Sequence, residues 1–294
     1  MNKVLNFGSI NVDHVYTVEH FVRPGETISA QNYRRFAGGK GLNQSIALAQ
    51  AGACVYHAGK VGAEDAWLKT LMEAKGVDTR YVEAFQGPSG HAVIQVDSSG
   101  ENAIVIVGGA NEQLSEVDIE RVIADFGAND YLLVQNEVNA VAKVLLAAKE
   151  RGLTIAFNPA PMTGAVLDYP LELVDIFIVN EAEAHGLVRE VEPDRVYEVF
   201  NQRFSGAALI LTMGQKGAAY FGSQGQFFQP AKQVAVVDST GAGDTFVGFF
   251  LAEFIKTKAP KAALAFASSA AALCVTRHGA ADSIPSRSEL NAAS

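Results

Sequence analysis

The stretch that decides the fold is VVDSTGAGDTFVGFFLA, residues 236–252, in which an apolar strand ending turns into an apolar helical run. Glycine at such a turn allows positive φ and leaves no side chain over the helix start. We therefore expect the exposed amides of Gly241, Ala242 and Gly243, with the helix dipole behind them, to form an anion pocket. The charge that develops on a transferred phosphoryl group is the kind of anion that such a pocket stabilises.

Asp244 follows these glycines, and two interpretations of it are open. Acids are favoured in the first turn of a helix, so Asp244 could be a simple capping residue. Alternatively, its carboxylate lies beside the anion pocket and accepts a proton from an attacking hydroxyl group. A general base of this kind typically accelerates a reaction on the order of 10²–10⁴-fold.

A second glycine cluster, FAGGKGLNQS at residues 36–45, predicts a similar turn near the start of the chain. The common nucleotide-binding motifs fit neither cluster. A Walker loop needs G-x-x-x-x-G-K-[ST], which neither Lys40 nor Lys60 provides, and the dinucleotide motif G-x-G-x-x-G fails at Phe246. Protein-kinase motifs are absent as well. A nucleotide bound by this chain would therefore use another geometry.

The composition is that of a globular protein, since 49% of the 294 residues are apolar and 19% are charged. A formal charge of −9 argues against nucleic acid or an anionic membrane as a partner. Cys54 and Cys274 provide no disulfide framework. No signal peptide and no apolar segment of membrane-spanning length is visible, so we expect a cytoplasmic protein.

Short apolar runs alternate with helical patterns, which predicts βαβ units around one mainly parallel sheet. The predicted strands are 4–9, 54–59, 131–135, 154–158, 176–180, 208–213 and 218–221. The predicted helices are 42–51, 67–75, 116–126, 140–151 and 195–204, with a further buried helix within 262–275. Two segments of alternating polarity, about 13–36 and 91–107, are expected to add a small antiparallel sheet as a lid on a single domain, 1–294.

The ordered pair GGKGLNQS and DSTGAGD resembles the signature pair of the ribokinase-like (PfkB) sugar and nucleoside kinases. Further matches follow along nearly the whole chain: GSINVD, RPGET, GANEQLS, NPAP, NEAEA, LTMGQKG and VTRHGAADSIP. The resemblance implies a three-layer αβα sandwich with a predominantly parallel central sheet and a small β-sheet lid. It also implies phosphoryl transfer from ATP to a small sugar, with the 5-hydroxyl group of D-ribose as the expected acceptor.

For the sugar, the resemblance assigns the catalytic base to Asp244 and the anion hole to Gly241, Ala242 and Gly243. Hydrogen bonds to sugar hydroxyls are implied for Asn11, Asp13, Gly39, Lys40, Asn43 and Glu137. A polyol requires several fixed donors and acceptors, so this polar set is chemically suitable. Taken alone, Asn11 and Asp13 could cap a turn, and Glu137 could be an ordinary acid at a helix start.

For the nucleotide, the resemblance implies ATP together with Mg²⁺. The segment from Asn180 to Glu183 matches an N-x-x-E pattern associated with phosphate and Mg²⁺, largely through water, because Mg²⁺ commonly keeps several waters. The residues implied for ATP are Asn180, Glu183, Thr212, Gly214, Gly217 and Gly243. Gly214 and Gly217 could equally be a β-turn pair, and both interpretations can hold together.

The resemblance also implies an activating monovalent cation, expected to be K⁺, beside the anion hole. The residues implied are Asp238 and Thr240 on one side, and Cys274, Arg277, Gly279 and Ser283 on the other, mostly through backbone carbonyls. Only Asp238 offers an anionic side chain there, and Arg277 could be an ordinary surface charge.

Several alternatives stay open at this point. The chain could be a related kinase of deoxyribose, fructose or a nucleoside. It could also be a sugar sensor without turnover, although Asp244 and both glycine motifs argue against that. A nicotinamide-dependent oxidoreductase is disfavoured by the missing dinucleotide motif. A homodimer formed through the lid is compatible with the sequence, because exposed sheet edges invite pairing.

Overall fold

The central layer of the structure is a sheet of mainly parallel strands. The computed structural model describes residues 2–189 and 193–292. Within these residues the central sheet has the strand order β13-β12-β11-β10-β9-β8-β1-β4-β5, and only the pairings of β12 are antiparallel. In that order the strands are Gly225–Pro230, Gly217–Gly222, Ala208–Thr212, Ile176–Asn180, Thr154–Asn158, Tyr131–Gln135, Lys3–Phe7, Cys54–Gly62 and Asp78–Phe85.

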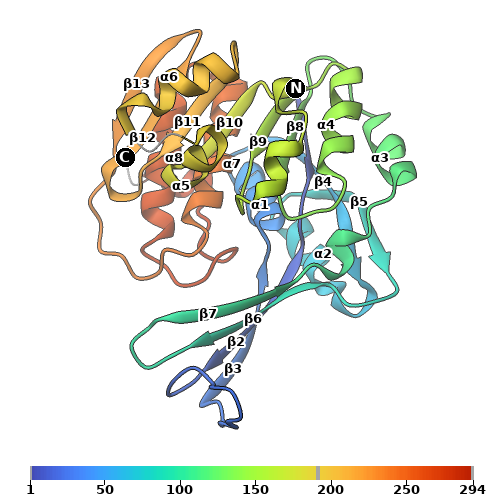
Figure 1. Cartoon of the computed structure of the whole chain (residues 1–294), viewed down its shortest axis with the longest axis vertical. Helices are drawn as coiled ribbons and strands as arrows, with labels where there is room; N and C mark the ends of the chain where they lie inside the picture. The colour runs from blue at the N-terminus through green and yellow to red at the C-terminus, as the bar shows by residue number, and fades with distance from the viewer. Residues whose placement is uncertain (1, 190–192, 293–294) are drawn as a thin grey trace.

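Helices cover both faces of the central sheet and complete three layers (Figure 1). One face carries α1 (Lys40–Gln50), α2 (Trp67–Ala74), α7 (Ala242–Thr257) and α8 (Pro260–Cys274), with α9 (Arg287–Ala292) beside α8. The other face carries α3 (Glu116–Ile123), α4 (Val141–Glu150), α5 (Glu181–Val188) and α6 (Pro193–Arg203). The predicted three-layer αβα sandwich is therefore confirmed.

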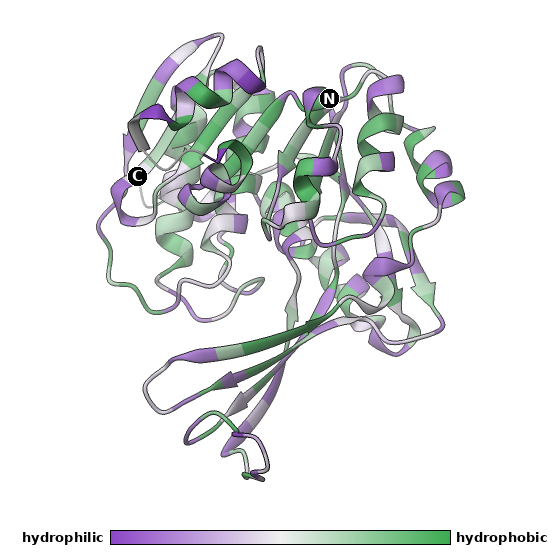
Figure 2. Ribbon diagram, in the orientation of Figure 1, coloured by the Kyte–Doolittle hydropathy of each residue, from purple (hydrophilic) through white to green (hydrophobic). Residues whose placement is uncertain are grey.

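The two hydrophobic cores follow from the alternation of side chains along buried strands. In β8, Leu133 belongs to the core beneath α1 and α7, whereas its neighbours Leu132 and Val134 belong to the core beneath α3 and α4. Successive strand side chains point to opposite faces, so a strand covered on both sides reads as a continuous apolar run. Figure 2 shows these apolar strands between helices whose outer surfaces are more polar.

A smaller sheet projects from this body, and we call it the lid sheet (Figure 1). Its strands, in sheet order, are β3 (Asn32–Gly38), β2 (Asn11–Thr17), β6 (Gly90–Val96) and β7 (Asn102–Val107). The outer pairs are antiparallel as predicted, whereas β2 and β6 run parallel. Asp97 fixes the tip of the β6–β7 hairpin, because its Oδ1 accepts hydrogen bonds from the amides of Ser99 (2.9 Å) and Glu101 (3.0 Å).

Two strands and two helices described here were not predicted from the sequence, namely β5, β13, α5 and α9. Both strands lie at the edges of the central sheet and mix exposed with partly buried residues, so neither shows a continuous apolar run. In contrast, the predicted bounds of β8, β9 and β10 coincide with the observed ones. The hydrophobic pattern therefore predicted the inner strands of the sheet and missed the two edge strands.

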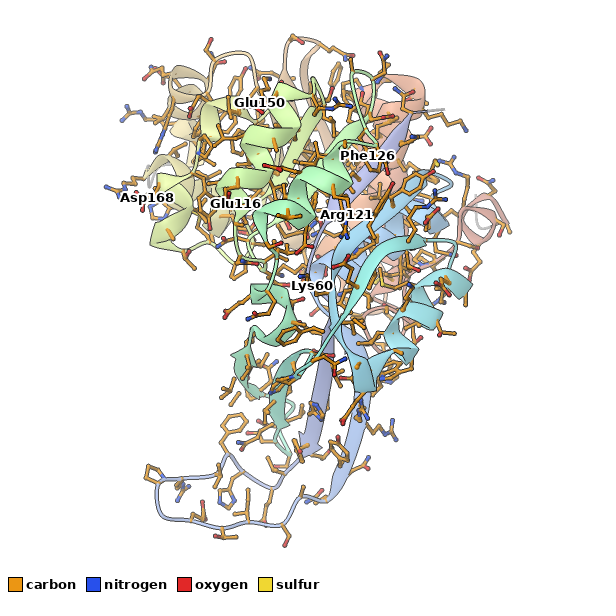
Figure 3. All side chains as sticks on the ribbon, turned by 90° about the vertical axis from the view of Figure 1, so that its right-hand side faces the viewer. Lys60, Glu116, Arg121, Phe126, Glu150 and Asp168 are labelled. Atoms are coloured by element: carbon orange, nitrogen blue, oxygen red, sulfur yellow. The ribbon has the colours of Figure 1, made fainter. Side chains whose placement is uncertain are left out.

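Charged side chains lie mainly on the outside of the body, where some of them join neighbouring elements (Figure 3). Lys60 of β4 extends to α3, with its Nζ 2.7 Å from Oδ2 of Asp118, and Arg121 of α3 pairs with Glu83 of β5. The more exposed of these pairs, that of Arg121 and Glu83, contributes only about 0–1 kcal/mol. Among the described residues, no helix has both the length and the apolar character needed to cross a membrane.

One edge of the central sheet collects the polar residues of interest. The carboxyl ends of the parallel strands meet there, and ligands of open α/β sheets bind at such edges. The polar residues at or just beyond these strand ends are Ser9, Asn11, Glu137, Asn158, Asn180 and Thr212. The lid sheet starts at the same edge, because β2 begins shortly after β1 ends. This edge is therefore the candidate site.

Candidate active site

The turn into α7 needs glycine at its first position. Gly241 precedes the helix with φ +75°, and a side chain there would begin 3.1 Å from Cα of Ala280. Both the left-handed backbone and the close approach favour glycine. A side chain at Gly243 would meet nothing within 4 Å, so the helix start is open on that side. The amide of Ala242 donates to the carbonyl oxygen of Ser239 at 3.3 Å.

Asp244 lies in the first turn of α7 and points toward α1. Its Oδ2 accepts a hydrogen bond from Nδ2 of Asn43 (3.0 Å), and its Oδ1 accepts one from Nε2 of Gln44 (2.9 Å). Burial raises the pKa of Asp244, while Lys40 and the two amide donors oppose that rise. The carboxylate is thus held by another helix, which is more than a capping residue requires.

The glycines around Lys40 allow α1 to begin directly against β1. Gly39 has φ +91°, and a side chain there would lie 3.0 Å from the carbonyl oxygen of Ser9. A side chain on Gly41 would lie 2.3 Å from the backbone nitrogen of Ser9. The glycine–lysine–glycine spacing is therefore a packing requirement that also brings Lys40 to the edge of the sheet.

Glu137 and Lys40 form the centre of the candidate site. Oε2 of Glu137 accepts hydrogen bonds from the Lys40 amide (2.9 Å) and from Oγ of Ser9 (2.5 Å). Burial raises the pKa of Glu137, and Lys40 opposes the rise. Burial alone would lower the pKa of Lys40, but Asp244, Glu137 and Glu183 outweigh it, so that pKa is raised. The ammonium group therefore stays charged among three carboxylates.

Asn11 and Asp13 reach the same site from β2 of the lid sheet. Burial, followed by the negative charge of Glu137, raises the pKa of Asp13 to about 6. Asn11 is buried, and its Oδ1 accepts a hydrogen bond from Nδ2 of Asn111 at 2.7 Å. Asn111 in turn accepts a hydrogen bond from the Ile10 amide at 3.0 Å. The lid sheet thus contributes an amide and a carboxylate that are fixed at its base.

The residues predicted for the nucleotide lie on neighbouring strand ends. Asn180 and Glu183 form a capping box at the start of α5, with the Glu183 amide 2.8 Å from Oδ1 of Asn180. Burial raises the pKa of Glu183 despite these hydrogen bonds. Thr212 pairs with Asn180 across the sheet. The turn that follows β11 contains Gly214 and Gly217, both at positive φ, and the Lys216 amide donates to the Met213 carbonyl within it. The backbone of this segment therefore agrees with the β-turn interpretation.

The residues predicted for a monovalent cation come from two loops that contact each other. Asp238 accepts hydrogen bonds from Thr240 and from the Gly279 amide, and these lower its pKa although burial acts in the opposite direction. Cys274 Sγ lies 3.0 Å from Oγ of Ser283 and 3.9 Å from the Thr240 carbonyl oxygen. The loops therefore bring five of the six predicted residues into contact.

Arg277 is the exception in this set as far as its side chain is concerned. Its Nη2 lies 2.7 Å from Oε1 of Glu289, in a partly exposed ion pair. The side chain therefore serves a surface contact, and only the backbone of Arg277 remains near the two loops. Within the described residues, no cluster of three or more His, Cys, Asp or Glu side chains is suited to a metal ion.

Several polar residues of the site escaped the sequence predictions. They are Ser9, Gln44, Asn111 and Asn158, all of which are buried. Three of them lie within the quoted segments GSINVD, GGKGLNQS and GANEQLS, and Asn158 begins NPAP. The available signal was a polar side chain inside an otherwise buried segment, which requires a hydrogen-bonding partner.

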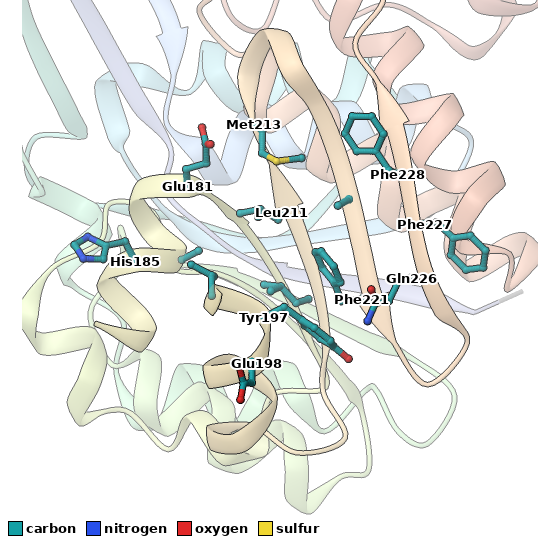
Figure 4. A pocket seen from close by; sticks show the side chains of 14 residues that line it. Glu181, His185, Tyr197, Glu198, Leu211, Met213, Phe221, Gln226, Phe227 and Phe228 are labelled. Carbon is teal, nitrogen blue, oxygen red and sulfur yellow. The ribbon is translucent and has the colours of Figure 1, made fainter. Parts of the chain in front are cut away.

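A cavity of about 830 Å³ lies elsewhere (Figure 4). Residues of α5 and α6 line it together with the facing side of β11, β12 and β13, including Tyr197, Leu209 and Phe221. None of its lining residues belongs to the predicted site. The chemistry indicated by the sequence is therefore confined to the carboxyl edge of the central sheet.

Comparison with known proteins relates this arrangement to a family. The chain matches the family described as pfkB family carbohydrate kinase over residues 1–287. This chain belongs to the pfkB family. It is accordingly a phosphotransferase with an alcohol group as acceptor.

The pfkB relatives are similar over their full length. Ribokinase of Haemophilus influenzae is 36% identical over 300 residues, covering 98% of this chain and 97% of the relative. Deoxyribokinase of Salmonella typhi is 32% identical over 300 residues, covering 97% and 96%. The likeness therefore includes both lobes of the structure, the body and the lid sheet.

Solved structures show the same similarity in three dimensions. The ribokinase of Cryptococcus neoformans var. grubii serotype A in complex with ADP has a TM-score of 0.88 at 34% identity, over 100% of both chains. The Arabidopsis thaliana ribokinase complexed with ribose and ATP has a TM-score of 0.86 at 30% identity, covering 99% of this chain and 97% of its own. The fold of this pfkB member is thus the ribokinase fold.

Proposed function

We propose that this protein is an ATP-dependent kinase that transfers the γ-phosphate to the 5-hydroxyl group of D-ribose. The observation that carries the proposal is the position of Asp244. Its carboxylate lies at the glycine-rich start of α7, held by α1 and close to the charge of Lys40. A base beside an amide-lined anion site is the arrangement that attack by an alcohol on a phosphoryl group requires.

In the proposed reaction, Asp244 accepts the proton of the attacking hydroxyl group. The O–H bond breaks as the sugar oxygen bonds to the γ-phosphorus, and the bond from that phosphorus to the bridging oxygen of ADP breaks. The amides of Gly241 and Gly243 stabilise the charge that develops on the phosphoryl oxygens. Ala242 contributes less, because its amide already donates to Ser239.

The sugar would be held by the polar set at the base of the lid sheet. Asn11 and Asp13 approach from β2, and Lys40, Asn43 and Glu137 approach from the body. Asn43 retains a buried Oδ1 with no hydrogen-bonding partner among the described residues, which suits a sugar hydroxyl donor. Buried groups of this kind penalise any sugar that leaves them unpaired.

The nucleotide would lie over the ends of β10 and β11, with Thr212, Gly214 and Gly217 beside its base and ribose. Mg²⁺ bound to ATP would supply positive charge that offsets the charge of the phosphates. Glu183 suits a water-mediated contact to that ion, since both of its carboxylate oxygens already accept hydrogen bonds from Asn180. Asn180 would orient it from the N-cap of α5.

K⁺ is the proposed activating cation, held between the loop of Asp238 and Thr240 and the loop from Cys274 to Ser283. The supporting observation is that Asp238 bridges these loops through Thr240 and Gly279. Backbone carbonyls and one carboxylate are the oxygen ligands that a hard cation prefers. The cation would act on the anion site through the backbone near Gly241, without contact to the sugar.

We further propose that residues 1–294 act as one domain and that two copies associate through their lid sheets. On the edge strand β7, Ile104, Val105 and Ile106 are 50%, 64% and 61% exposed, and Figure 2 shows the strand as strongly apolar. A second copy would cover this surface. Light scattering should give twice 31.2 kDa for the native chain and a smaller mass for Val105→Lys. Equal masses would contradict the lid interface.

A cytoplasmic location is also proposed, and the two free cysteines support it. Cys54 is partly buried and Cys274 is buried, and neither forms a disulfide in the structure. Unpaired thiols are typical of a reducing compartment.

The function is tested by measuring ADP formation directly by chromatography over a panel of acceptors. The panel contains D-ribose, 2-deoxy-D-ribose, D-fructose and adenosine, each with KCl or NaCl. We expect D-ribose to give the highest kcat/KM, and phosphorus NMR to place the phosphate on the 5-oxygen. A higher value for 2-deoxy-D-ribose would favour the second candidate, suggested by the deoxyribokinase relative. No ADP with any acceptor would contradict the kinase proposal.

A further inference from the structure

A continuous row of buried polar side chains leads away from Asp244 into the core. Its members, in order from the far end, are His57, Ser45, Asn6, Gln135 and Gln44. These five side chains are at most 1% exposed. Burial of so many polar groups is costly unless each is hydrogen-bonded. The row therefore calls for an explanation beyond packing.

The far end of the row is fixed by a backbone carbonyl. His57 Nε2 lies 3.1 Å from the carbonyl oxygen of Gly8, which can only accept, so Nε2 must carry a proton. Burial lowers the pKa of His57 to about 4, so the ring is neutral at pH 7 and its Nδ1 is an acceptor. Ser45 Oγ, 2.8 Å from Nδ1, must then be the donor.

The orientation of every following amide is determined from there. Asn6 Nδ2 faces both Oγ of Ser45 (2.8 Å) and the carbonyl of Gly41 (2.9 Å), so its Oδ1 is left to accept from Nε2 of Gln135 (3.0 Å). The same Nε2 donates to Oε1 of Gln44 at 2.7 Å. A flipped amide at any step would place two acceptors or two donors against each other.

Gln44 consequently presents its NH₂ group, and never its oxygen, to Asp244. One N–H donates to Oδ1 of Asp244 and the other to Oδ1 of Asn158, both at 2.9 Å. Asn158 is itself oriented by a backbone carbonyl, because its Nδ2 donates to Ile178 at 2.9 Å. The donor aimed at Asp244 is thus set from both sides by backbone carbonyls of Gly8, which directly follows β1, of α1 and of β10.

We propose that Gln44 is a positioning residue for Asp244, and that the buried row from His57 to Gln135 exists to hold its amide in the donor orientation. The inference rests on the proposed kinase function. Gln44 keeps one carboxylate oxygen occupied and the carboxylate ionised, which leaves the remaining lone pairs of Asp244 directed at the acceptor hydroxyl. Gln135 and His57 act through Gln44 and do not touch the reacting atoms.

Charged groups on the neighbouring elements affect the ionisation of Asp244. Lys40 of α1 favours its ionised form, whereas Glu137, after β8, and Glu183 of α5 oppose ionisation. Since burial favours the protonated acid, Lys40 and the donors on Gln44 and Asn43 are needed to keep the base available. Removing one donor should therefore move the pH profile, which simple loosening of the core would not do.

The test replaces Gln44 by Met, with Gln50→Met as the matched control. Gln50 lies on the same helix, and its Nε2 bonds the Lys75 carbonyl at 2.9 Å, outside the site. We expect Gln44→Met to lower kcat for D-ribose by about ten- to a hundredfold, the loss of one hydrogen bond to a charged group. The acidic limb of kcat against pH should move to higher pH, with the Kd of D-ribose from calorimetry unchanged within a few fold. Gln50→Met should leave kcat and its pH profile as in the native chain.

Two double variants separate positioning from general loosening. In an Asp244→Asn background, Gln44→Met should cost less than threefold further, because the residue acts through Asp244. Gln135→Met should lower kcat several-fold alone and add nothing to Gln44→Met. Additive losses in either pair, or an unmoved pH limb in Gln44→Met, would overturn the inference. If Gln44→Met fails to fold, the Gln135→Met pH profile decides the matter. A native chain that phosphorylates no acceptor would instead refute the kinase proposal.

Discussion

The proposed sugar side and the proposed nucleotide side of the site are built in opposite ways. On the proposed sugar side, Glu137, Asn43 and Asp244 are joined to residues about one hundred to two hundred positions distant in sequence. On the proposed nucleotide side, Asn180 bonds Glu183 three positions away, and the Lys216 amide bonds the Met213 carbonyl three positions away. One side is assembled by the fold as a whole, and the other by local turns.

This difference has a physical consequence. Long-range contacts in a buried setting fix groups before a ligand arrives and shift their pKa values, as for Asp13 and Asp244. Local turns near the surface can be altered with less effect on the rest of the chain. Substitutions on the sugar side should therefore change chemistry and stability together, whereas those on the nucleotide side should change one ligand at a time.

The strongest expected effect is that of Asp244→Asn. Without the proposed base, kcat should fall on the order of 10²–10⁴-fold, as is typical for general-base catalysis. The Kd of D-ribose in calorimetry should change by only a few fold, because the amide keeps the shape of the carboxylate. A variant that retains more than about a tenth of native kcat would contradict the role of Asp244.

Asp13→Asn should weaken sugar binding but stabilise the fold. Loss of a carboxylate acceptor should raise KM for D-ribose about ten- to a hundredfold. The pKa of Asp13 is raised to about 6 in the folded protein, so the ionised group costs stability above that pH, and the cost vanishes below its unfolded value. Urea titration should therefore show a gain of roughly 2 kcal/mol near neutral pH, allowing for partial exposure, and little gain near pH 4.

Asp97→Asn provides a control of opposite sign on the same lid sheet. Hydrogen bonds from Ser99 lower the pKa of Asp97, so its ionised form stabilises the fold above the usual pKa of aspartate and loses that effect as pH falls. Its replacement should reduce stability at neutral pH and leave KM for D-ribose unaltered. Equal stability changes in the two variants would remove the electrostatic explanation.

On the nucleotide side, Gly217→Ala and Gly214→Ala form a matched pair. A side chain on Gly217, at φ +122°, would lie 2.1 Å from the carbonyl oxygen of Gln229. One on Gly214, at φ +54°, meets nothing within 4 Å. We expect KM for ATP to rise about tenfold with Gly217→Ala and about two- to threefold with Gly214→Ala, with D-ribose binding unaffected by either. Equal effects would contradict the explanation by the close approach at Gly217.

A smaller effect on kcat than that of Asp244→Asn is expected for Asp238→Asn. Without the charge that joins the two loops, the increase in kcat given by KCl over NaCl should disappear, a loss of about five- to tenfold. Glu289→Gln is the control, because it disturbs the Arg277 ion pair beside the same loops without touching Asp238. Retained K⁺ activation in Asp238→Asn would exclude the proposed cation site.

The sequence could predict most of the fold because the inner strands carry an unmistakable signal. β8, β9 and β10 are buried on both faces, and their continuous apolar runs stop where the strands stop. The edge strands β5 and β13 lack that pattern, since one side of each meets solvent. α5 was overlooked because its first turn consists of acids and alanines. These residues belong to the motif NEAEA but form no apolar stripe along the helix.

The site could be predicted only in part, for a different reason. The motif residues Asp244 and Lys40 follow from the glycine turns and the family resemblance. Gln44 and Asn158 were missed because their partners lie 200 and 114 positions away, and no pattern along the chain records such a distance. Sequence spacing detects turns and helix faces, whereas the buried row is a property of the assembled strands.

The attachment of Asn11 and Asp13 to β2 has a last consequence. These two residues belong to the lid sheet, while Lys40, Glu137 and Asp244 belong to the body. A sugar that bonds both groups would connect the lid sheet to the body. Sugar binding and the orientation of the lid sheet would then be coupled in one equilibrium. An acceptor that lacks the hydroxyl group for Asp13 would leave the lid sheet without this connection to the body. Water could then compete with the acceptor for the γ-phosphate of ATP.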